Sequence, residues 1–375
     1  MNNIKKSVDK NENVCFLTEQ IITYLGNKRT LLDFIGNAVR VVQKELGREK
    51  LDIVDIFSGS GVVSRYFKQY ANNLYVNDLE KYCYVINKCY LTNKSKVDIE
   101  KLNEYYRHIK NRLKEPLQEG FITRLYSPAD DNNIQQGERV FYTHKNALLI
   151  DNIRRIIDEI PEDYKQYFLA PLLYEASVHN NTSGVFKGFY KNSNTGIGQF
   201  GGNGKNALTR ILGDVDLKLP IFSDFECDVH IFNEDSNLLA KKLPPVDIVY
   251  IDPPYNQHPY GSNYFMLNLI CENKEPKNIS KVSGIPVDWN KSAYNKKAEI
   301  KKQLIDLCDS LDSKYILISF NSDGFISQEE MVELLSKYGE VRVFDKDYNT
   351  FRGCRNLNDR DIHIKEFLYL VNTKK

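Results

Sequence analysis

The alternation of apolar and polar residues along the chain predicts a parallel sheet. Apolar residues at roughly helical spacing indicate a first helix within residues 27–46. A buried strand at 51–57, a tight turn, a helix starting at Val62 and a second strand at 73–78 follow it. The order strand, helix, strand implies a right-handed parallel unit.

The pattern changes in the middle of the chain. Residues 98–171 are charged and helical in periodicity, with prolines as interruptions. Residues 176–213 contain eight of the twenty glycines, four basic residues and no acidic one. Strand-like runs return at 227–232, 246–251 and 314–320, and a short helix at 328–339 precedes an antiparallel pair at 340–348 and 363–371. We therefore expect a sheet interrupted by an insertion.

Composition narrows the class of protein. With 375 residues, 42% of them hydrophobic, the chain can bury a substantial core in a large domain with a smaller attachment. Its start is polar and no window approaches the ~20 apolar residues of a membrane span, so we expect a cytoplasmic protein. Seven cysteines without a C-x-x-C pair indicate neither a disulfide framework nor a zinc knuckle. Since the net charge is +1, affinity for a polyanion must come from local charge.

A glycine-containing turn joins the first predicted strand to a helix, Asp55-Ile56-Phe57-Ser58-Gly59-Ser60-Gly61. Glycines there let the backbone approach a ligand, and Asp78, at the end of the next strand, can accept hydrogen bonds from ribose hydroxyls. Together they indicate a nucleotide-like cofactor, although the turn alone is equally compatible with an ordinary tight turn. A dinucleotide fingerprint is disfavoured because Ser64 replaces the third glycine of G-x-G-x-x-G.

The run Asp252-Pro253-Pro254-Tyr255 directly follows an apolar strand. Prolines fix an extended turn and lack N–H groups, so carbonyl acceptors lie beside a carboxylate and an aromatic ring. Those groups can hold an amino group on a planar base. In an exposed loop the run would be a surface turn, but its place at the end of a buried strand favours a catalytic role.

The chemistry expected of this run is methyl transfer to adenine N6, whose lone pair is delocalised into the ring. If the Asp252 carboxylate and the Pro253 carbonyl each accept one N6 hydrogen, the nitrogen moves toward tetrahedral geometry while Tyr255 stacks on the base. Proximity and orientation then supply most of the acceleration, and no metal is required. A base in a duplex must be flipped out to reach such a site.

In these features the chain resembles the Dam-like alpha group of DNA adenine N6-methyltransferases, which are partners or orphans of restriction-modification systems. YLGNKRTLL at 24–32 resembles the family's N-terminal cofactor motif, DIFSGSG its glycine motif and DPPY its catalytic motif, in the order of the alpha group. Two further matches are weaker. NED at 233–235 lies where the family places an acidic residue near the adenine of the cofactor, and YNTFRG at 348–353 resembles the family's late motif beside the target base.

The resemblance covers nearly the whole chain except residues 98–175. It implies an α/β fold, the Rossmann-like S-adenosylmethionine-dependent methyltransferase fold with a mixed seven-stranded sheet. A helical and loop target-recognition domain is inserted in that fold. We expect a polar tail at 1–18, a catalytic domain at 19–97 and 227–375, and the insertion at 98–226.

The resemblance also implies the site residues. Asp252, Pro253, Pro254 and Tyr255 are the expected catalytic residues. The residues expected to bind S-adenosylmethionine are Tyr24, Gly26, Lys28, Asp55, Phe57, Ser58, Gly59, Ser60, Gly61, Asp78, Asp235 and Asp252. For Lys28 the alternative is a solvated lysine, for Tyr24 a packing role, and for Asp235 a helix cap. His258 is the only histidine expected to line the site.

Residues 180–210 combine glycines, cations and aromatic rings and are expected to form the main target-recognition surface on double-stranded DNA. The alternative is a flexible solvated loop. The expected DNA contacts are Asn181, Phe186, Lys187, Tyr190, Lys191, Lys205 and Arg210.

Other acceptors remain as alternatives: cytosine N4, an RNA base or a protein amide. A non-catalytic DNA-binding relative is a further one. A cytosine-C5 enzyme is disfavoured because no Pro-Cys dipeptide occurs. A cognate restriction endonuclease, acting separately, is an expected companion, and no membrane partner is expected.

Overall fold

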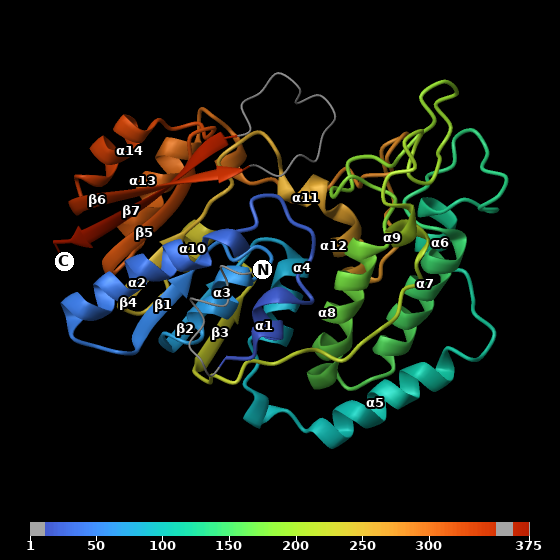
Figure 1. Ribbon diagram of the computed structural model, residues 1–375, viewed down its shortest axis with the longest axis horizontal. Helices are drawn as coiled ribbons and strands as arrows, with labels where there is room; N and C mark the ends of the chain where they lie inside the picture. The colour runs from blue at the N-terminus through green and yellow to red at the C-terminus, as the bar shows by residue number, and fades with distance from the viewer. Residues whose placement is uncertain (1–11, 350–362, 375) are drawn as a thin grey trace.

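The computed structural model describes residues 12–349 and 363–374 and contains one seven-stranded sheet (Figure 1). The strands lie in the order β3-β2-β1-β4-β5-β7-β6. Their bounds are β1 Leu51–Asp55, β2 Ala71–Asn77, β3 Asp228–Phe232, β4 Val246–Ile251, β5 Ser313–Asn321, β6 Gly339–Asn349 and β7 His363–Thr373. Neighbours from β3 to β5 are parallel, whereas β7 is antiparallel to both β5 and β6. The predicted mixed seven-stranded sheet is confirmed.

The central strands are mostly apolar because both faces of the sheet are covered. All six residues of β4 are buried. Ile248 and Tyr250 face one hydrophobic core, and Val249 and Ile251 face the other. This two-sided burial explains why the strand reads as a continuous apolar run instead of an alternating one.

Helices pack on both faces of the sheet. The first core contains side chains of α2, α3 and α4, and the second contains those of α10, α13 and α14. Their bounds are α2 Leu32–Leu46, α3 Val62–Phe67, α4 Lys81–Tyr90, α10 Ser236–Ala240, α13 Ile300–Ser310 and α14 Gln328–Leu335. Short helices are α11 Tyr260–Asn263, α12 Phe265–Glu272, η2 Arg29–Leu31, η3 Lys94–Lys96 and η4 Ala293–Asn295.

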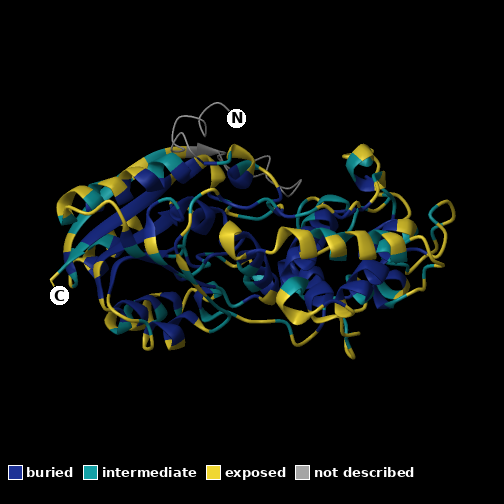
Figure 2. Ribbon diagram, turned by 90° about the horizontal axis from the view of Figure 1, so that it is seen from below, coloured by how far each residue is buried: buried dark blue, intermediate teal, exposed yellow. Residues whose placement is uncertain are grey.

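The segment between β2 and β3 carries the inserted helices, drawn in teal and green to one side of the sheet in Figure 1. They are α5 Ile99–Arg112, α6 Phe121–Tyr126, α7 His144–Asp158, α8 Glu162–Val178 and α9 Leu208–Leu212. Helix α8 is buried along most of its length and packs on α4, so the insertion shares the first core with the sheet. Figure 2 shows that α5 carries a largely exposed outer face.

The expectation of a polar tail over residues 1–18 is wrong for its described end. Val14–Thr18 forms α1, which buries Phe16 and Leu17 completely. The guanidinium of Arg65 in α3 donates hydrogen bonds to the carbonyls of Phe16 and Gln20 at 2.8 and 2.9 Å. These bonds give the buried guanidinium main-chain partners and fix α1 to α3.

The strand register places the ends of three neighbouring strands together. Asp55 at the end of β1 pairs with Val76 of β2 and with Tyr250 of β4. The residues that follow these strands therefore lie at the same carboxyl edge of the sheet, where ligands bind in open α/β folds.

Candidate active site

The glycine turn after β1 is built for close backbone approach. Gly59 has φ +51°, and its N–H donates to Asp78 Oδ2 at 2.8 Å. A Cβ on Gly59 would lie 2.8 Å from Cε1 of Tyr24, and one on Gly61 (φ +77°) would lie 2.5 Å from Asn87 Oδ1. Both positions therefore require glycine because of conformation and space together.

Asp78 is held by backbone donors at the end of β2. Its two carboxylate oxygens accept the N–H groups of Gly59 and Glu80 at 2.8 and 2.9 Å. Burial raises the pKa of Asp78, while these hydrogen bonds act against that rise. Each carboxylate oxygen keeps further lone pairs, so Asp78 can still accept hydroxyl donors from a ligand.

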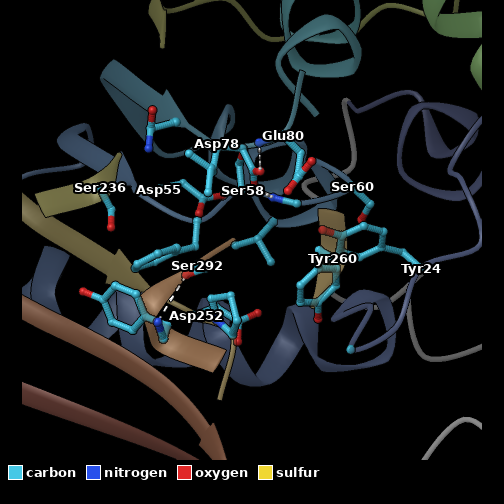
Figure 3. Close-up of a pocket in the computed structure, with 18 of the residues that line it drawn as sticks. Tyr24, Asp55, Ser58, Ser60, Asp78, Glu80, Ser236, Asp252, Tyr260 and Ser292 are labelled. Carbon is cyan, nitrogen blue, oxygen red and sulfur yellow. Dashed lines mark hydrogen bonds between the residues drawn. The ribbon is translucent and has the colours of Figure 1, made fainter. Parts of the chain in front are cut away.

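A cavity of about 890 Å³, partly open to solvent, lies between these turns. Figure 3 shows Asp78 and Glu80 on one side, Asp252 on the other, and Tyr24 beside Tyr260. Of the residues predicted to bind the cofactor, all but Gly61 line it: Tyr24, Gly26, Lys28, Asp55, Phe57, Ser58, Gly59, Ser60, Asp78, Asp235 and Asp252. The structure therefore brings together segments 24–28, 55–60 and 78 from separate parts of the sequence.

Asp252 follows β4 and forms a buried charge cluster. Lys28 Nζ lies 3.1 Å from Asp252 Oδ1 and 3.1 Å from Glu366 Oε1 in β7. Ser319 Oγ in β5 donates to Glu366 Oε1 at 2.5 Å. The Lys28 and Glu366 side chains are 4% and 2% exposed, and that of Asp252 is 17% exposed. Lys28 is thus a buried partner of the DPPY turn and not a solvated lysine.

The pKa values of this cluster follow from burial and from the shared charge. Burial raises the pKa of Asp252 to about 6, with Lys28 acting against the rise and Glu366 adding to it. Burial alone would lower the pKa of Lys28, but the Asp252 and Glu366 carboxylates outweigh it and hold that pKa well above its usual value. Lys28 is therefore charged, and Asp252 is ionised at neutral pH.

Tyr255 has a different environment from the one expected of a base-stacking residue. It is 9% exposed and packs against Phe320, with ring centroids 5.1 Å apart. Its hydroxyl accepts a hydrogen bond from Asn321 Nδ2 at 2.9 Å. In this conformation Tyr255, like Pro253, does not line the cavity, whereas Pro254 does.

Two further expectations near the site are resolved. His258 is exposed and does not line the cavity, so the expectation that it lines the site is wrong. Asp235 does line it, and its side chain also caps α10 by accepting the N–H groups of Asn237 and Leu238 at 3.0 and 3.2 Å. The two readings of Asp235 are thus compatible. The YNTFRG segment at 348–353 lies almost entirely outside the described residues, and no side chain in it is described.

Sequence reasoning missed one wall of the cavity. Asn290, Ser292, Tyr294 and Asn295 line it, and no strand-end or glycine signal marks them in the sequence. The Tyr294 ring packs edge-on to Phe57 at 5.0 Å, and its hydroxyl donates to Asn237 Oδ1 at 2.8 Å.

Tyr260 and Glu80 were also missed. The Tyr260 ring stacks on Tyr24 with centroids 4.9 Å apart, and its hydroxyl donates to the Leu25 carbonyl at 3.0 Å. Burial raises the pKa of Glu80 to about 7, and Asn268 Nδ2 donates to its carboxylate at 2.6 Å. Glu80 lies two residues after Asp78, so proximity to that strand end was the available signal.

The side chains of the glycine-rich segment, residues 176–213, fall into two groups, those that are buried or bonded inside the protein and those that are exposed. Asn181 is fully buried and donates to the carbonyls of Val140 and Gln199, while Phe186 lies in the core at 1% exposure. The Arg210 guanidinium donates to main-chain carbonyls, among them those of Asn180 and Thr182 at 2.8 and 3.1 Å. These contacts hold the segment's own shape. Asn181 and Phe186 are buried and so do not reach a ligand at the surface, whereas Arg210 is half-buried and its DNA contact stays a prediction.

The other four residues expected to contact DNA lie at least partly at the surface. Lys187, Lys191 and Lys205 are exposed, and Tyr190 is half-buried. Lys191 Nζ lies 5.0 Å from the centroid of the Phe189 ring, a cation–π contact that holds the amine at the surface. These four residues are available to a ligand.

Within residues 12–349 and 363–374, no group of three or more His, Cys, Asp and Glu side chains is arranged to hold a metal ion. In the same ranges no helix has the length and apolar character needed to span a bilayer.

Comparison with known proteins identifies the family. A family model described as D12 class N6 adenine-specific DNA methyltransferase matches residues 24–334. The Type II methyltransferase M.CviAII of Paramecium bursaria Chlorella virus 1 is 30% identical over 358 residues, which cover 93% of this chain and 98% of that relative. M.NlaIII of Neisseria lactamica, also a Type II methyltransferase, is 28% identical over 93% of this chain and 99% of its own length.

The modification methylase StsI of Streptococcus sanguinis is 29% identical over 94% of this chain, which spans only 52% of StsI. The family match covers the glycine turn, Asp78 and the DPPY turn, the segments that form the cavity. The chain therefore belongs to the D12 class of N6 adenine-specific DNA methyltransferases, enzymes that use S-adenosylmethionine.

Proposed function

We propose that the cavity at the ends of β1, β2 and β4 holds S-adenosylmethionine together with a flipped-out adenine, and that Asp252 and Pro253 position N6 for methylation. The observation that carries this proposal is the position of Asp252. It follows a wholly buried strand and opens into the same cavity as the glycine turn and Asp78.

The residues present fit the cofactor. Gly59 leaves room where a Cβ would meet Tyr24, and Asp78 offers carboxylate lone pairs suited to ribose hydroxyls. Phe57 and Tyr294 supply apolar surface for a planar ring, and Asp235 and Ser236 supply polar groups beside it. When bound, S-adenosylmethionine supplies an electrophilic methyl group on its sulfonium sulfur.

Asp252 orients the acceptor nitrogen. Lys28 contacts its Oδ1, which leaves Oδ2 to accept one N6 hydrogen. The Pro253 carbonyl accepts the other, which requires the turn to shift, since Pro253 does not line the cavity in this conformation. Two acceptors on one amino group draw its lone pair out of conjugation with the ring. After N6 has gained a methyl group it must lose a proton, and the Asp252 carboxylate is the neighbouring acceptor.

Base flipping requires a surface on which the extruded adenine can rest. Tyr255 is packed away from the cavity in the structure, so in the proposed complex the base lies against Pro254 and Tyr260, which do line it. Stacking on Tyr255 would require its hydroxyl to leave Asn321.

Target recognition is assigned to the exposed part of the glycine-rich segment. Lys187, Lys191 and Lys205 are suited to phosphates, and Tyr190 to a base or sugar. Because the relatives are Type II methyltransferases and modification methylases, we further propose that a separate endonuclease of the same specificity accompanies this enzyme.

Methyl transfer by an Asp252→Ala variant tests the proposal. Labelled S-adenosylmethionine and unmethylated duplex DNA are the substrates, and cofactor binding is measured separately by calorimetry. We expect transfer to fall at least about a thousandfold, since orientation supplies most of the acceleration, while cofactor affinity changes little. Asp312→Ala, an exposed carboxylate just before β5, serves as the matched control. Retained transfer by Asp252→Ala would refute the assigned role.

A further inference from the structure

Residues 274–297 form a lysine-rich strap between α12 and α13. It carries six exposed lysines: Lys274, Lys277, Lys281, Lys291, Lys296 and Lys297. Among the described residues none of the six has a carboxylate within 4 Å, whereas Lys301, just after the strap, pairs with Glu330. Glu275, an acidic residue of the strap, is paired with Arg124. Asp288 is the other acidic residue of the strap and is exposed, so the strap carries a net charge of +4, with six lysines against two carboxylates.

The inserted region holds one part of the strap. The Tyr126 hydroxyl at the end of α6 donates to the Gly284 carbonyl at 2.7 Å, and Arg139 donates to the Lys281 carbonyl at 3.2 Å. Ser280 N donates to the Ile285 carbonyl at 2.8 Å, closing a hairpin whose tip includes Val282, 62% exposed. Figure 1 shows this part as orange chain beside α6.

The catalytic fold holds the other part. Asn295 Nδ2 donates to the Asn256 carbonyl, directly after the DPPY turn, at 2.8 Å. Asn290 and Ser292 line the cofactor cavity, and a Cβ on Gly261 would lie 2.4 Å from the Asn290 carbonyl oxygen. The strap thus passes from the recognition region to the rim of the active-site cavity.

Between these anchors the strap stands away from α12. A hollow of about 1120 Å³, open to solvent, separates the two. Its lining is mixed and includes Phe265, Leu269 and Glu272 of α12 and Lys277, Asp288 and Trp289 of the strap. Lys291 Nζ lies 5.4 Å from the Trp289 ring, and Val287 is 59% exposed. Lysines interleaved with exposed apolar and aromatic groups are typical of surfaces that bind nucleic acid.

We propose that the lysine-rich strap is a second DNA-contacting element, which binds phosphates next to the target adenine while residues 187–205 bind the duplex further along. This inference rests on the proposed function, because it takes duplex DNA as the partner of the cavity. Lysines that lack carboxylate partners retain their full charge for phosphates, and neutralising each phosphate releases counterions. Asn290, Ser292 and Asn295 belong to the strap and also line the cavity. The same segment would therefore bind phosphates and help to place the base.

The salt dependence of DNA binding by a Lys277→Gln/Lys281→Gln/Lys291→Gln variant tests the proposal. A short fluorescent duplex is titrated by anisotropy at several salt concentrations. We expect weaker binding at low salt and a slope of log K against log salt reduced by about two to three, since each phosphate contact contributes about 0.9. Unchanged thermal unfolding and cofactor affinity confirm that the variant is folded.

The matched control is Lys44→Gln/Lys96→Gln/Lys337→Gln. Lys44 and Lys337 precede β1 and β6 in the chain, and Lys96 lies near the start of β3, where Asn93 donates to the Cys227 carbonyl. All three are exposed, at the edge of the sheet opposite the cavity. A slope change confined to the strap variant supports the proposal. An unchanged slope, or an equal change in the control, overturns it. A wild-type protein that binds DNA but methylates no adenine would instead refute the proposed function and leave the strap result interpretable.

Discussion

At the scale of single residues, Asp252 depends on two side chains distant from it in the sequence. Lys28 contacts both Asp252 and Glu366, so a single cation serves one buried and one partly buried carboxylate. Burial and Glu366 raise the pKa of Asp252, while Lys28 lowers it. Glu366 is thus a positioning residue: it fixes Lys28 and adjusts the pH range in which Asp252 is ionised.

A Glu366→Gln variant should shift the acid limb of the pH–rate profile. Asp252 must be ionised to accept an N6 hydrogen, so wild-type kcat/KM should fall as the pH drops through about 6. Removing the Glu366 charge removes one cause that raises the Asp252 pKa. We therefore expect the limb to move to lower pH, with KM for DNA little changed.

Glu340→Gln is the control for that shift, because Glu340 is an exposed glutamate on the neighbouring strand β6. Its profile should match that of the wild type. An acid limb that stays near the wild-type position in Glu366→Gln would show that Glu366 does not act on Asp252.

Local motifs explain which site residues were predictable. The glycine turn, Asp78 and Asp252 each follow a buried strand, and parallel topology brings such strand ends together. Glu366 and Tyr294 have no such local pattern, and only the path of the chain brings them to the cavity. Asn181 and Arg210 were expected to contact DNA because they lie in a basic, glycine-rich segment, yet their polar groups also bind main-chain carbonyls.

At the scale of elements, α1 shows how a short segment becomes structural. Its sequence VCFLT follows a polar stretch and is too short for a helical period to be recognised. Phe16 and Leu17 are nevertheless fully buried, and Asn13 caps the helix through Cys15 N. The tertiary contacts with Arg65 stabilise α1, because a five-residue helix is unstable in isolation.

Phe16→Ala should destabilise the protein by about 3–5 kcal/mol, the usual cost of removing a fully buried aromatic ring. Urea unfolding followed by circular dichroism measures the effect. Val14→Ala on the same helix is the control, since Val14 is 37% exposed and its loss should cost under about 0.5 kcal/mol. Equal stability of the two variants would mean that α1 is not part of the folded core.

The longer elements were predictable because their pattern persists. The strands β1, β2, β4 and β5 and the antiparallel pair β6–β7 lie where the apolar runs predicted them. Helix α8 continues through Pro171 to Val178, beyond the predicted helical stretch, because its buried surface compensates for the hydrogen bond that proline lacks.

At the scale of the whole molecule, the two segments proposed to contact DNA, the glycine-rich segment and the lysine-rich strap, both pack against residues 126–142. Val140 and Asn181 link the glycine-rich segment to residues 126–142, which also hold the lysine-rich strap through Tyr126 and Arg139. With a net charge of only +1, these local concentrations of lysine must supply the attraction to DNA.

Lys187→Gln/Lys191→Gln should weaken DNA binding and reduce the salt slope by about two, one contact for each lysine. Combined with the strap substitutions, the slope reductions should add, since the two groups would contact different phosphates. Anisotropy titrations of the double, triple and combined variants test this. A double variant with the wild-type slope would remove residues 187–191 from the interface.

The position of β7 has a consequence for the timing of synthesis. Among the described strands β6 is bonded to β7 alone, so residues 339–349 have no partner in the sheet until residues 363–373 emerge from the ribosome. A nascent chain can already contain the glycine turn and the DPPY turn but not Glu366, so Lys28 has only one of its two carboxylate partners. Full methylation activity should therefore begin only when β7 has been translated and inserted between β5 and β6.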